Sequence, residues 1–519
     1  MSGQTAGQLL ATVLDAGSFA SWDEPPMALP HDADYRATLE AAQLRAGVDE
    51  AVLTGRGRIT GRAVAVVVSE FNFLAGSIGV AASERIVRAV ERATEERLPL
   101  LAATASGGTR MQEGALAFLR MTSITAAIGV HKAAGLPYLV YLRHPTTGGV
   151  FASWGSLGHL TVAEPGALIG FLGPKVHAAL YGTPFPDGVQ VAESLHAHGL
   201  VDAVLPPHQL AAVTSRVLAA LDPPTPLPDT AALPDTAAAP AAAAPAAAVP
   251  AAAAPAAVGP VAPEPSAWDS ISATRRPDRP GVPTLLRIAT ADVIPLAGSG
   301  EGERGVGLIL AIVRFGAASC VLLGQDRRAQ RRNALGPGEL RTARRGMRLA
   351  AEFGLPLVTV IDTPGAALSV EAEQGGLAGE IARCLADLVA LAVPTVSVLL
   401  GQGAGGAALA LLPADRVLAA RHAWLAPLPP EGAAAILYRD PLRAAEVAAA
   451  QGVRAGDLYR AGAVDHIVPE LPDAADEPEE FCRRVGATVE SEVLALRRLP
   501  PTNRLARRAA RLRGLGLTP

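Results

Sequence analysis

Two glycine pairs, Gly148-Gly149 and Gly405-Gly406, each follow a short apolar run that ends in small or polar residues. Glycine lacks a Cβ atom, so it reaches positive φ angles easily and lets a ligand approach the main chain. Where a helix begins directly after such a turn, its first N–H groups have no acceptor inside the helix and attract developing negative charge. The pairs therefore predict two sites that can stabilise an oxyanion.

Both pairs belong to an internal repeat with a fixed offset of 257 residues. Adding 257 to Pro99, Gly108, Pro137, Gly148 and Gly149 gives Pro356, Gly365, Pro394, Gly405 and Gly406. One offset that holds at five positions indicates duplicated architecture. A lone glycine pair can serve only to pack a helix on a strand, but two pairs in register favour a functional role. The candidate catalytic residues are Gly107, Gly108, Gly148, Gly149, Gly365, Gly405 and Gly406.

Apolar runs introduced by proline precede the glycine turns in both copies. They cover residues 98–104 and 136–143 in the first copy and residues 355–361 and 393–400 in the second. Short apolar runs bounded by turn residues predict buried strands, and stretches of small and apolar residues between them predict helices. Alternating strands and helices predict an α/β fold in two duplicated domains.

The boundary between the copies is compositional. Ala and Pro dominate residues from about 222 to 266, and such a segment cannot build a core or a long helix. At 519 residues the chain suits two or three domains. We predict an N-terminal domain over residues 1–221, a linker over 222–280 and a C-terminal domain over 281–519.

Charge, cysteine spacing and hydropathy argue against several classes of protein, among them nucleic-acid-binding, disulfide-rich and membrane-spanning proteins. A net charge of −4 argues against nucleic acid as a partner. The three cysteines lie far apart, which excludes a disulfide framework and a zinc ribbon. The apolar stretch 388–412 is interrupted by proline, glutamine and glycine, so a buried strand-turn-helix unit is favoured over a membrane span. No secretory signal pattern opens the chain. We expect a soluble, cytoplasmic protein that does not act at a membrane.

Other motifs in the sequence are weaker evidence of function than the two glycine pairs. Residues 401–406 (GQGAGG) match G-x-G-x-x-G, but Pro413 follows closely and no acidic residue lies about 20 positions on, so dinucleotide binding is disfavoured. Arg110 is a candidate substrate-binding residue, because its guanidinium can hold an anionic group, although pairing with Glu113 is equally compatible with its position. Histidines near the first site are interpreted as structural, and the basic C-terminal stretch NRLARRAARLRG as a solvent-exposed helix.

Longer stretches carry a family resemblance. FNFLAGSIGVAASERIVRAVE and ASGGTRMQEGALAFLRM, within a match from about Ser18 to Leu205, resemble the β subunit of bacterial acetyl-CoA carboxylase carboxyltransferase. FGLPLVTVIDTPGAA and GQGAGGAALALLPADRVLAARHAWLAPLPPEG resemble its α subunit. The chain thus looks like β and α subunits fused across the Pro/Ala segment.

The resemblance implies two ββα-spiral domains of the crotonase-like superfamily and transfer of a carboxyl group from N1 of biotin to acetyl-CoA. Malonyl-CoA, used in fatty-acid and polyketide synthesis, would be the product. By analogy, the first four glycines hold the thioester enolate and CoA, and Gly365, Gly405 and Gly406 face the biotin ureido ring. In the family the ureido nitrogen removes the substrate proton, so no side-chain base is implied.

The family also implies partners and cofactors. Biotin is expected on a separate biotin carboxyl carrier protein, because only Lys132 and Lys175 are present and neither lies between methionines. ATP would be used only by a partner biotin carboxylase, and a homo-oligomer is expected. The family's four zinc-binding cysteines are missing from residues 1–50, so no zinc is predicted.

Some positions depart from the α-subunit pattern. Residues 323–330 read LGQDRRAQ, DTPGAALS replaces DTPGAYPG, and PPEG at 429–432 replaces SPEG. Two alternatives to acetyl-CoA carboxylation therefore stay open. One is the same chemistry on propionyl-CoA or another acyl-CoA, and the other is a carboxyltransferase-like assembly partner without catalysis.

Overall fold

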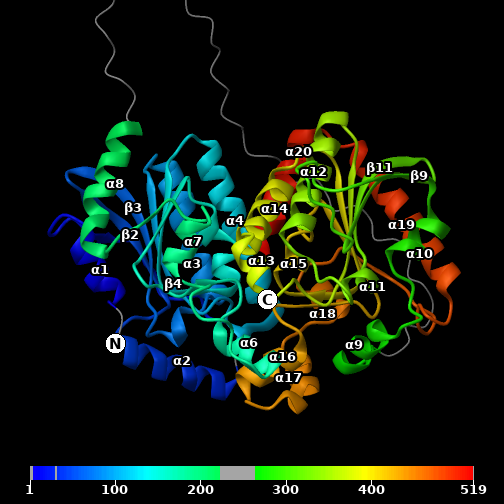
Figure 1. Ribbon diagram of the computed structural model, residues 1–519, viewed down its shortest axis with the longest axis horizontal. Helices are drawn as coiled ribbons and strands as arrows, with labels where there is room; N and C mark the ends of the chain where they lie inside the picture. Colours follow the sequence, from blue (N-terminus) through cyan, green and yellow to red (C-terminus); the bar gives the residue numbers. More distant parts are fainter. Residues whose placement is uncertain (1–3, 30–31, 222–263, 518–519) are drawn as a thin grey trace, which may run out of the picture.

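Two eight-stranded sheets, one in each half, form the framework of the protein (Figure 1). The computed structural model describes residues 4–29, 32–221 and 264–517. The first sheet has the order β1-β2-β3-β4-β5-β6-β8, with β7 paired to β5. Its strands are β1 (Ala20–Ser21), β2 (Val52–Ile59), β3 (Arg62–Ser69), β4 (Leu100–Ser106), β5 (Tyr138–Thr147), β6 (Leu160–Ala163), β7 (Ile169–Gly170) and β8 (Ala203–Val204).

The second sheet repeats this topology, with the order β16-β14-β13-β12-β11-β10-β9 and β15 paired to β13. In each sheet the first three strands are antiparallel and the later pairs are parallel. The strands are β9 (Ala291–Leu296), β10 (Leu308–Phe315), β11 (Ala318–Gln325), β12 (Leu357–Thr363), β13 (Thr395–Ala404), β14 (Arg416–Ala420), β15 (Trp424–Ala426) and β16 (His466–Val468).

The offset of 257 residues holds in three dimensions. Strands β4 and β5 coincide with β12 and β13 once 257 is added to their bounds. The register irregularity between Thr104 and Ser106 has its counterpart between Ile361 and Thr363. The predicted duplication of an α/β unit is confirmed, and each of these strands begins two residues after the start of the apolar run that predicted it.

Helices cover the sheets and join the halves. The first half contains α1 (Ala6–Val13), α2 (Ala33–Ala46), α3 (Val80–Glu95), α4 (Gly114–Ala133), α5 (Gly148–Phe151), α6 (Pro174–Tyr181), α7 (Ala192–Ala197), α8 (Pro207–Leu221) and the 3₁₀ turns η1 (Leu74–Gly76), η2 (Met111–Glu113) and η3 (Trp154–Ser156). Helix α4 has the length and composition of a membrane span, but 72% of its apolar window is buried inside the protein. It therefore acts as a core helix.

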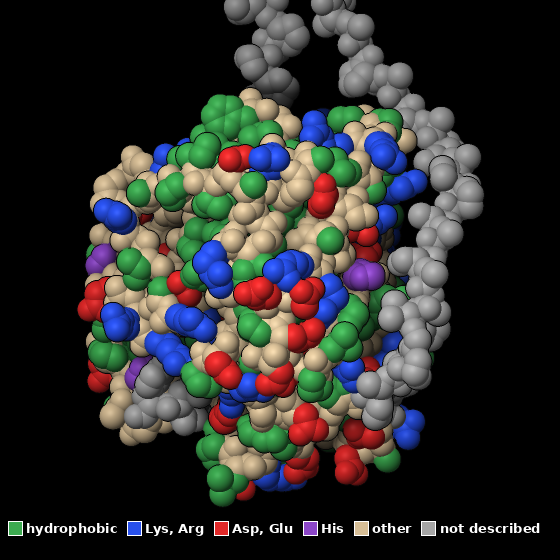
Figure 2. All heavy atoms as spheres, turned by 90° about the vertical axis from the view of Figure 1, so that its right-hand side faces the viewer, with side chains coloured by type: hydrophobic (Ala, Val, Ile, Leu, Met, Phe, Trp, Pro, Cys, Tyr) green, Lys and Arg blue, Asp and Glu red, His purple; other side chains and the backbone are tan. Residues whose placement is uncertain are grey.

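The second half contains α9 (Ala267–Arg275), α10 (Val282–Ala289), α11 (Arg327–Gln330), α12 (Pro337–Phe353), α13 (Val370–Gln374), α14 (Leu377–Ala390), α15 (Gly405–Leu409), α16 (Pro430–Leu437), η4 (Pro441–Arg443), α17 (Ala444–Ala450), α18 (Ala455–Arg460), α19 (Pro478–Arg497) and α20 (Pro501–Gly514). Helix α14 packs against α4 at the centre of the molecule, so the two halves share one extended core (Figure 1). Acidic and basic side chains are interspersed on the outer face of the second half, which fits the small net charge (Figure 2).

Helix α9 lies within the range predicted as linker. Residues 222–263 of that range lie outside the described residues, but Ala267–Arg275 are helical. The Ser266 side chain caps this helix by accepting the Asp269 N–H, and Ile271 is fully buried in a cluster with Trp424. The linker prediction therefore extends too far at its C-terminal end, because the apolar residues after Ser266 give the chain something to bury.

Helix α20 is not the solvent-exposed helix that its basic composition suggested. Arg504 and Arg508 are buried, and the Nε and Nη2 atoms of Arg508 donate to the Asp415 carboxylate at 2.9 and 2.8 Å. Further along, Ser123 of α4 donates to the Leu512 carbonyl, and Arg120 donates to the Arg513 and Leu515 carbonyls at 3.0 and 3.2 Å. The C-terminal helix of the second half thus docks on the core helix of the first.

Replacing Arg508 by methionine should lower the unfolding free energy by about 3–5 kcal/mol, because the buried Asp415 carboxylate loses its ion-pair partner. Urea-induced unfolding followed by circular dichroism measures the change. Arg56→Met is the control, since Arg56 forms a largely exposed pair with Glu96 that should contribute less than about 1 kcal/mol. Equal losses of unfolding free energy in the two variants would show that the Arg508–Asp415 pair does not stabilise the fold more than an exposed pair does.

Candidate active site

A cavity of about 450 Å³ lies between the two halves. Six of the seven candidate glycines line it: Gly107, Gly148 and Gly149 from the first half, and Gly365, Gly405 and Gly406 from the second. The remaining wall is mostly apolar and includes Phe118, Phe171, Leu172, Ile381, Leu409 and Ile436. The structure therefore brings the two glycine turns together at one site.

The first turn joins β5 to α5. Gly148 has a φ of +63° and is the first residue of α5, so a left-handed residue stands at the N-terminal end of this helix. Three candidate amides here already have acceptors. The N–H groups of Gly107, Gly108 and Gly148 donate to the Ala75 carbonyl, the Ser106 hydroxyl and the Phe171 carbonyl at 2.9, 3.0 and 3.0 Å. The Gly149 amide has no acceptor among the described residues, so it is the donor available to a ligand.

Gly108 does not line the cavity but packs directly behind this amide. Its φ is +104°, and a Cβ atom built on it would lie 3.1 Å from the Gly149 nitrogen and 3.2 Å from the Gly148 Cα. Gly108 thus keeps the first turn close to the neighbouring strand end without crowding the donor.

Gly108→Ala should reduce activity about 10-fold or more, because the added methyl group presses on the turn that orients the Gly149 donor. Gly135→Ala is a matched control: its φ is +74°, and no atom lies within 4 Å of the position of its Cβ. Both variants carry strain from a positive φ, but only the first crowds the site. Steady-state kinetics and thermal unfolding of both proteins separate the two effects, and equal activity losses would contradict the assignment.

The second turn joins β13 to α15 and mirrors the first. Gly405 has a φ of +65°, close to that of Gly148. The amides of Gly405 and Gly406 have no acceptor among the described residues. Gly365 has a φ of +133° and donates its N–H to the Thr363 hydroxyl at 3.1 Å. The second turn therefore presents two open donors where the first presents one.

Buried polar residues support the second turn from behind, and several come from the segment that departs from the α-subunit pattern. Gln325 donates to the Ala407 carbonyl at 2.8 Å. The Thr363 hydroxyl donates to the Gln330 side-chain oxygen at 2.6 Å. The substituted residues therefore contribute hydrogen bonds that hold the start of α15 and the end of β12. Sequence reasoning missed this role, because these partners are separated by 33 to 82 positions.

A buried carboxylate holds the strand that leads into the same turn. Asp362 accepts the Gln402 N–H at 3.0 Å and pairs with Arg327 at 3.1 Å. Burial raises the pKa of the Asp362 carboxyl, and the Arg327 charge opposes that shift. The pair fixes the end of β13, three residues before Gly405.

Arg110 has a structural role rather than the predicted substrate-binding role. It is 1% exposed, and its guanidinium binds both carboxylate oxygens of Glu50, Glu113 at 3.3 Å and the Ser77 carbonyl at 2.8 Å. The alternative pairing with Glu113 is present, but Glu50, 60 positions away, is the main partner. Arg110 does not line the cavity, and its burial leaves it no exposed donor for a phosphate or carboxylate.

The nearby histidines are also structural. His131 is buried between the Thr94 hydroxyl at 2.9 Å and the Pro137 carbonyl at 3.3 Å, and burial lowers its pKa. Nδ1 of His159 accepts the Tyr138 N–H at 3.0 Å, and Nδ1 of His144 accepts the Leu168 N–H at 3.1 Å. Among the described residues that line the cavity, none carries a carboxylate or an imidazole.

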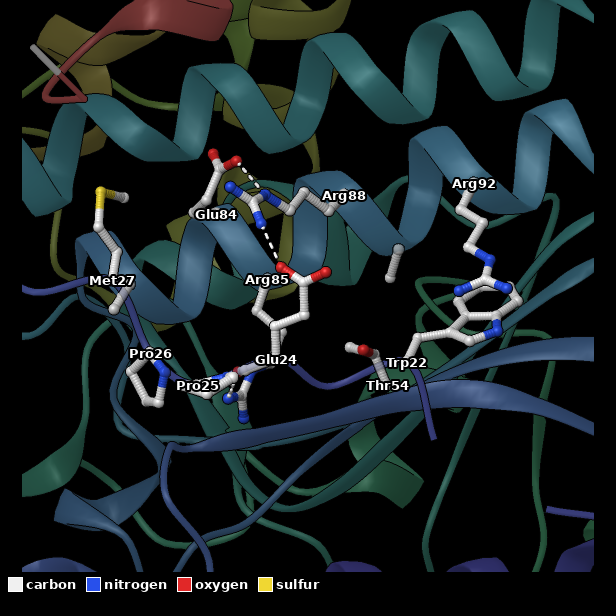
Figure 3. A pocket seen from close by; sticks show the side chains of 12 residues that line it. Trp22, Glu24, Pro25, Pro26, Met27, Thr54, Glu84, Arg85, Arg88 and Arg92 are labelled. Atoms are coloured by element: carbon white, nitrogen blue, oxygen red, sulfur yellow. Dashed lines mark hydrogen bonds and ion pairs between the residues drawn. The ribbon is translucent and has the colours of Figure 1, made fainter. Parts of the chain in front are cut away.

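A second cavity of about 290 Å³ lies between α3 and the segment Trp22–Met27 (Figure 3). Its arginines already have partners. Arg88 binds Glu24 and Glu84 at 2.7 Å each, and Arg92 stacks over the Trp22 ring at 4.6 Å. None of the candidate glycines lines this cavity. The main cavity is therefore the candidate active site.

Comparisons with known proteins identify the family. Residues 4–506 match the carboxyl transferase domain family. The chain is 58% identical to a probable biotin-dependent acyl-coenzyme A carboxylase beta3 subunit of Mycobacterium tuberculosis, covering 100% of this chain and 99% of that protein. It is 34% identical to the acetyl-coenzyme A carboxylase carboxyl transferase subunits beta/alpha of Salinispora tropica, covering 98% and 90%. A crystal structure of transcarboxylase 12S aligns with 21% identity and a TM-score of 0.36, covering 95% and 90% of the two chains.

Proposed function

Because the chain belongs to the carboxyl transferase domain family, with two crotonase-like halves, we propose that it carboxylates acetyl-CoA to malonyl-CoA. At the level of the family, the chain is a biotin-dependent acyl-CoA carboxyltransferase. The observation that carries the assignment is the pair of glycine turns with open amides in one cavity between the halves.

The reaction develops negative charge at two oxygens, which suits two sets of donors. Loss of the carboxyl group from N1 of biotin places charge on the ureido oxygen, and loss of the α-proton places charge on the thioester oxygen. When bound, carboxybiotin would supply the carboxyl group as CO₂ and take up the α-proton in its place, and the α-carbon of the acyl-CoA would form the new bond. Donors that meet charge only as it develops accelerate the chemical step.

The two turns take different substrates in this proposal. Gly149 donates to the thioester oxygen of the acyl-CoA, and Gly405 and Gly406 donate to the ureido oxygen of carboxybiotin. The lining fits both groups, because the main chain is bare at the glycines and the surrounding wall is apolar. An apolar wall excludes water and strengthens each N–H to oxygen interaction.

Acetyl-CoA is supported by similarity to relatives named as acetyl-coenzyme A carboxylase subunits, which are 34–38% identical. Similarity at 58% identity to a relative named only as an acyl-coenzyme A carboxylase subunit supports a second candidate, propionyl-CoA or another acyl-CoA. The test is a carboxylation assay with labelled bicarbonate, ATP, biotin carboxylase and carrier protein. Faster carboxylation of acetyl-CoA supports the proposal, and a preference for longer acyl groups supports the second candidate. Carboxylation of none of them supports the assembly-partner alternative.

Separate carrier and biotin carboxylase components complete the proposed enzyme, which we also propose to be a cytoplasmic homo-oligomer. ATP would be consumed by the biotin carboxylase component. The position of Lys132 makes it a poor biotin acceptor, because its side chain is partly buried and donates to the Leu157 carbonyl at 2.8 Å.

We expect no covalent biotin on this chain, measured by streptavidin blot after expression with a biotin ligase. The carrier protein, blotted beside it, is the positive control. A biotin signal on this chain that persists in a Lys132→Arg, Lys175→Arg double variant would be non-specific. A signal lost in that variant would contradict the requirement for a separate carrier.

A further inference from the structure

The segment Phe171–Gly173 follows β7 and lies between the two glycine turns. The Phe171 carbonyl accepts the Gly148 N–H at 3.0 Å, which ties the segment to the first turn. The Phe171 ring lies next to the second turn, since a Cβ atom built on Gly406 would lie 3.1 Å from Cε2 of Phe171. One residue of the first half therefore contacts both turns.

A carboxylate from the other half holds this segment. Glu373, on α13 of the second half, accepts the Phe171 N–H at 2.9 and 3.0 Å and the Leu172 N–H at 3.3 Å. The Gln190 side chain donates to the same carboxylate at 2.6 Å and to the Leu172 carbonyl at 2.7 Å. Burial raises the pKa of the Glu373 carboxyl, and these N–H donors oppose the shift. Two backbone amides and one side-chain amide thus converge on one carboxylate across the boundary.

The internal repeat does not account for this arrangement. The position 257 residues before Glu373 is Leu116, and the position 257 residues after Phe171 is Leu428. Leucine at 116 offers no side-chain acceptor, so among the described residues the carboxylate that holds Phe171 has no counterpart at the position given by the repeat. This contact breaks the symmetry of the duplicated fold beside the cavity. A function that only one side of the cavity needs would account for it.

We infer that Phe171 and Glu373 form a positioning pair that sets the distance between the two turns and so couples loss of the carboxyl group from biotin to its capture by the acyl-CoA. Neither side chain supplies a donor or a proton to the reaction. The inference rests on the proposed carboxyl transfer. Transfer requires the released CO₂ to reach the α-carbon of the acyl-CoA. A small displacement of one turn should therefore lower the rate of transfer far more than the rate of CO₂ release.

The test uses the full chain and measures two rates from carboxylated carrier protein. One is formation of carboxylated acyl-CoA, and the other is release of CO₂ in the same reaction. Phe171→Ala and Glu373→Gln should each lower transfer about 10-fold to 10²-fold. We expect the ratio of CO₂ released to product formed to rise at least about 3-fold, and the KM for acyl-CoA to change less than about 3-fold.

Glu91→Gln is the control, because Glu91 also pairs across the halves, with Arg513 at 2.8 Å, but lies away from the cavity lining. Its ratio should equal that of the unaltered chain. Phe171→Leu keeps an apolar contact and serves if Phe171→Ala does not fold, and it should give an intermediate ratio. Variants that lower transfer and release in parallel, or that leave the ratio unchanged, would overturn the inference. Absence of transfer by the unaltered chain would instead overturn the proposed function.

Discussion

Gly149→Val is expected to lower malonyl-CoA formation at least about 10²-fold, the loss seen when one oxyanion donor is removed. The Gly149 amide is the open donor of the first turn. A Cβ atom on this residue would lie 2.5 Å from the Thr109 hydroxyl oxygen, so the turn or that side chain has to move. Release of CO₂ from carboxybiotin in the absence of acyl-CoA should continue, because the second turn is untouched. Both rates can be followed with labelled carboxybiotin.

Gly129→Val is the matched control for this substitution. Gly129 lies in helix α4 with no atom within 4 Å of the position of its Cβ, and its φ is not positive. The control should retain near-normal transfer and a similar unfolding temperature. Near-normal transfer by a folded Gly149→Val protein would remove the first turn from the acyl-CoA site.

Gly406→Val is expected to abolish both transfer and release, with each rate reduced by at least about 10²-fold. The ureido oxygen would lose its donors, because the added side chain enters the space between the two halves. Its Cβ atom would lie 3.0 Å from Ile381 and 3.1 Å from Phe171, both closer than ordinary contact. Carboxybiotin decay without acyl-CoA is the measurement that distinguishes this variant from Gly149→Val.

Gly406→Ala provides a graded companion, since its methyl group would meet Ile381 and Phe171 at 3.0 to 3.2 Å but adds less bulk than valine. A loss that grows from alanine to valine, with unchanged unfolding temperature, supports steric exclusion at the site. If a folded Gly406→Val protein keeps near-normal transfer, the second turn does not bind the ureido oxygen of biotin, and the assignment of the two turns is wrong.

Local sequence was sufficient to predict the elements that build the site. Proline-led apolar runs predicted β4, β5, β12 and β13, and the fixed offset predicted that their turns are equivalent. Positive φ angles of +63° at Gly148 and +65° at Gly405 confirm why glycine stands at both turns. These features depend on neighbours within a few positions, which is the range over which residue type and spacing constrain the backbone.

Side-chain partners were predicted less well. For Arg110 the sequence leaves substrate binding and pairing with Glu113 open; the Glu113 contact is present, yet the main partner is Glu50. The basic composition of α20 predicts a solvent-exposed helix, yet Arg508 is buried and pairs with Asp415, 93 positions away. In both cases the partner is distant in sequence, and composition alone does not distinguish a buried ion pair from an exposed charge.

The sequence by itself determined that the chain holds two copies of one α/β unit, each with a glycine turn at the end of a strand, which we predict to bind an oxyanion. Only the tertiary structure decided which amides remain open, because the Ser106 and Thr363 hydroxyls and the Ala75 and Phe171 carbonyls accept the other four. It also placed the two turns in one cavity and Glu373 of one half on Phe171 of the other. The physical reason is that the conformation of a turn follows from its own residues and their neighbours. Which amides find acceptors, and which surfaces form the cavity, depend on the packing of α4, α14 and α20 across the boundary between the halves.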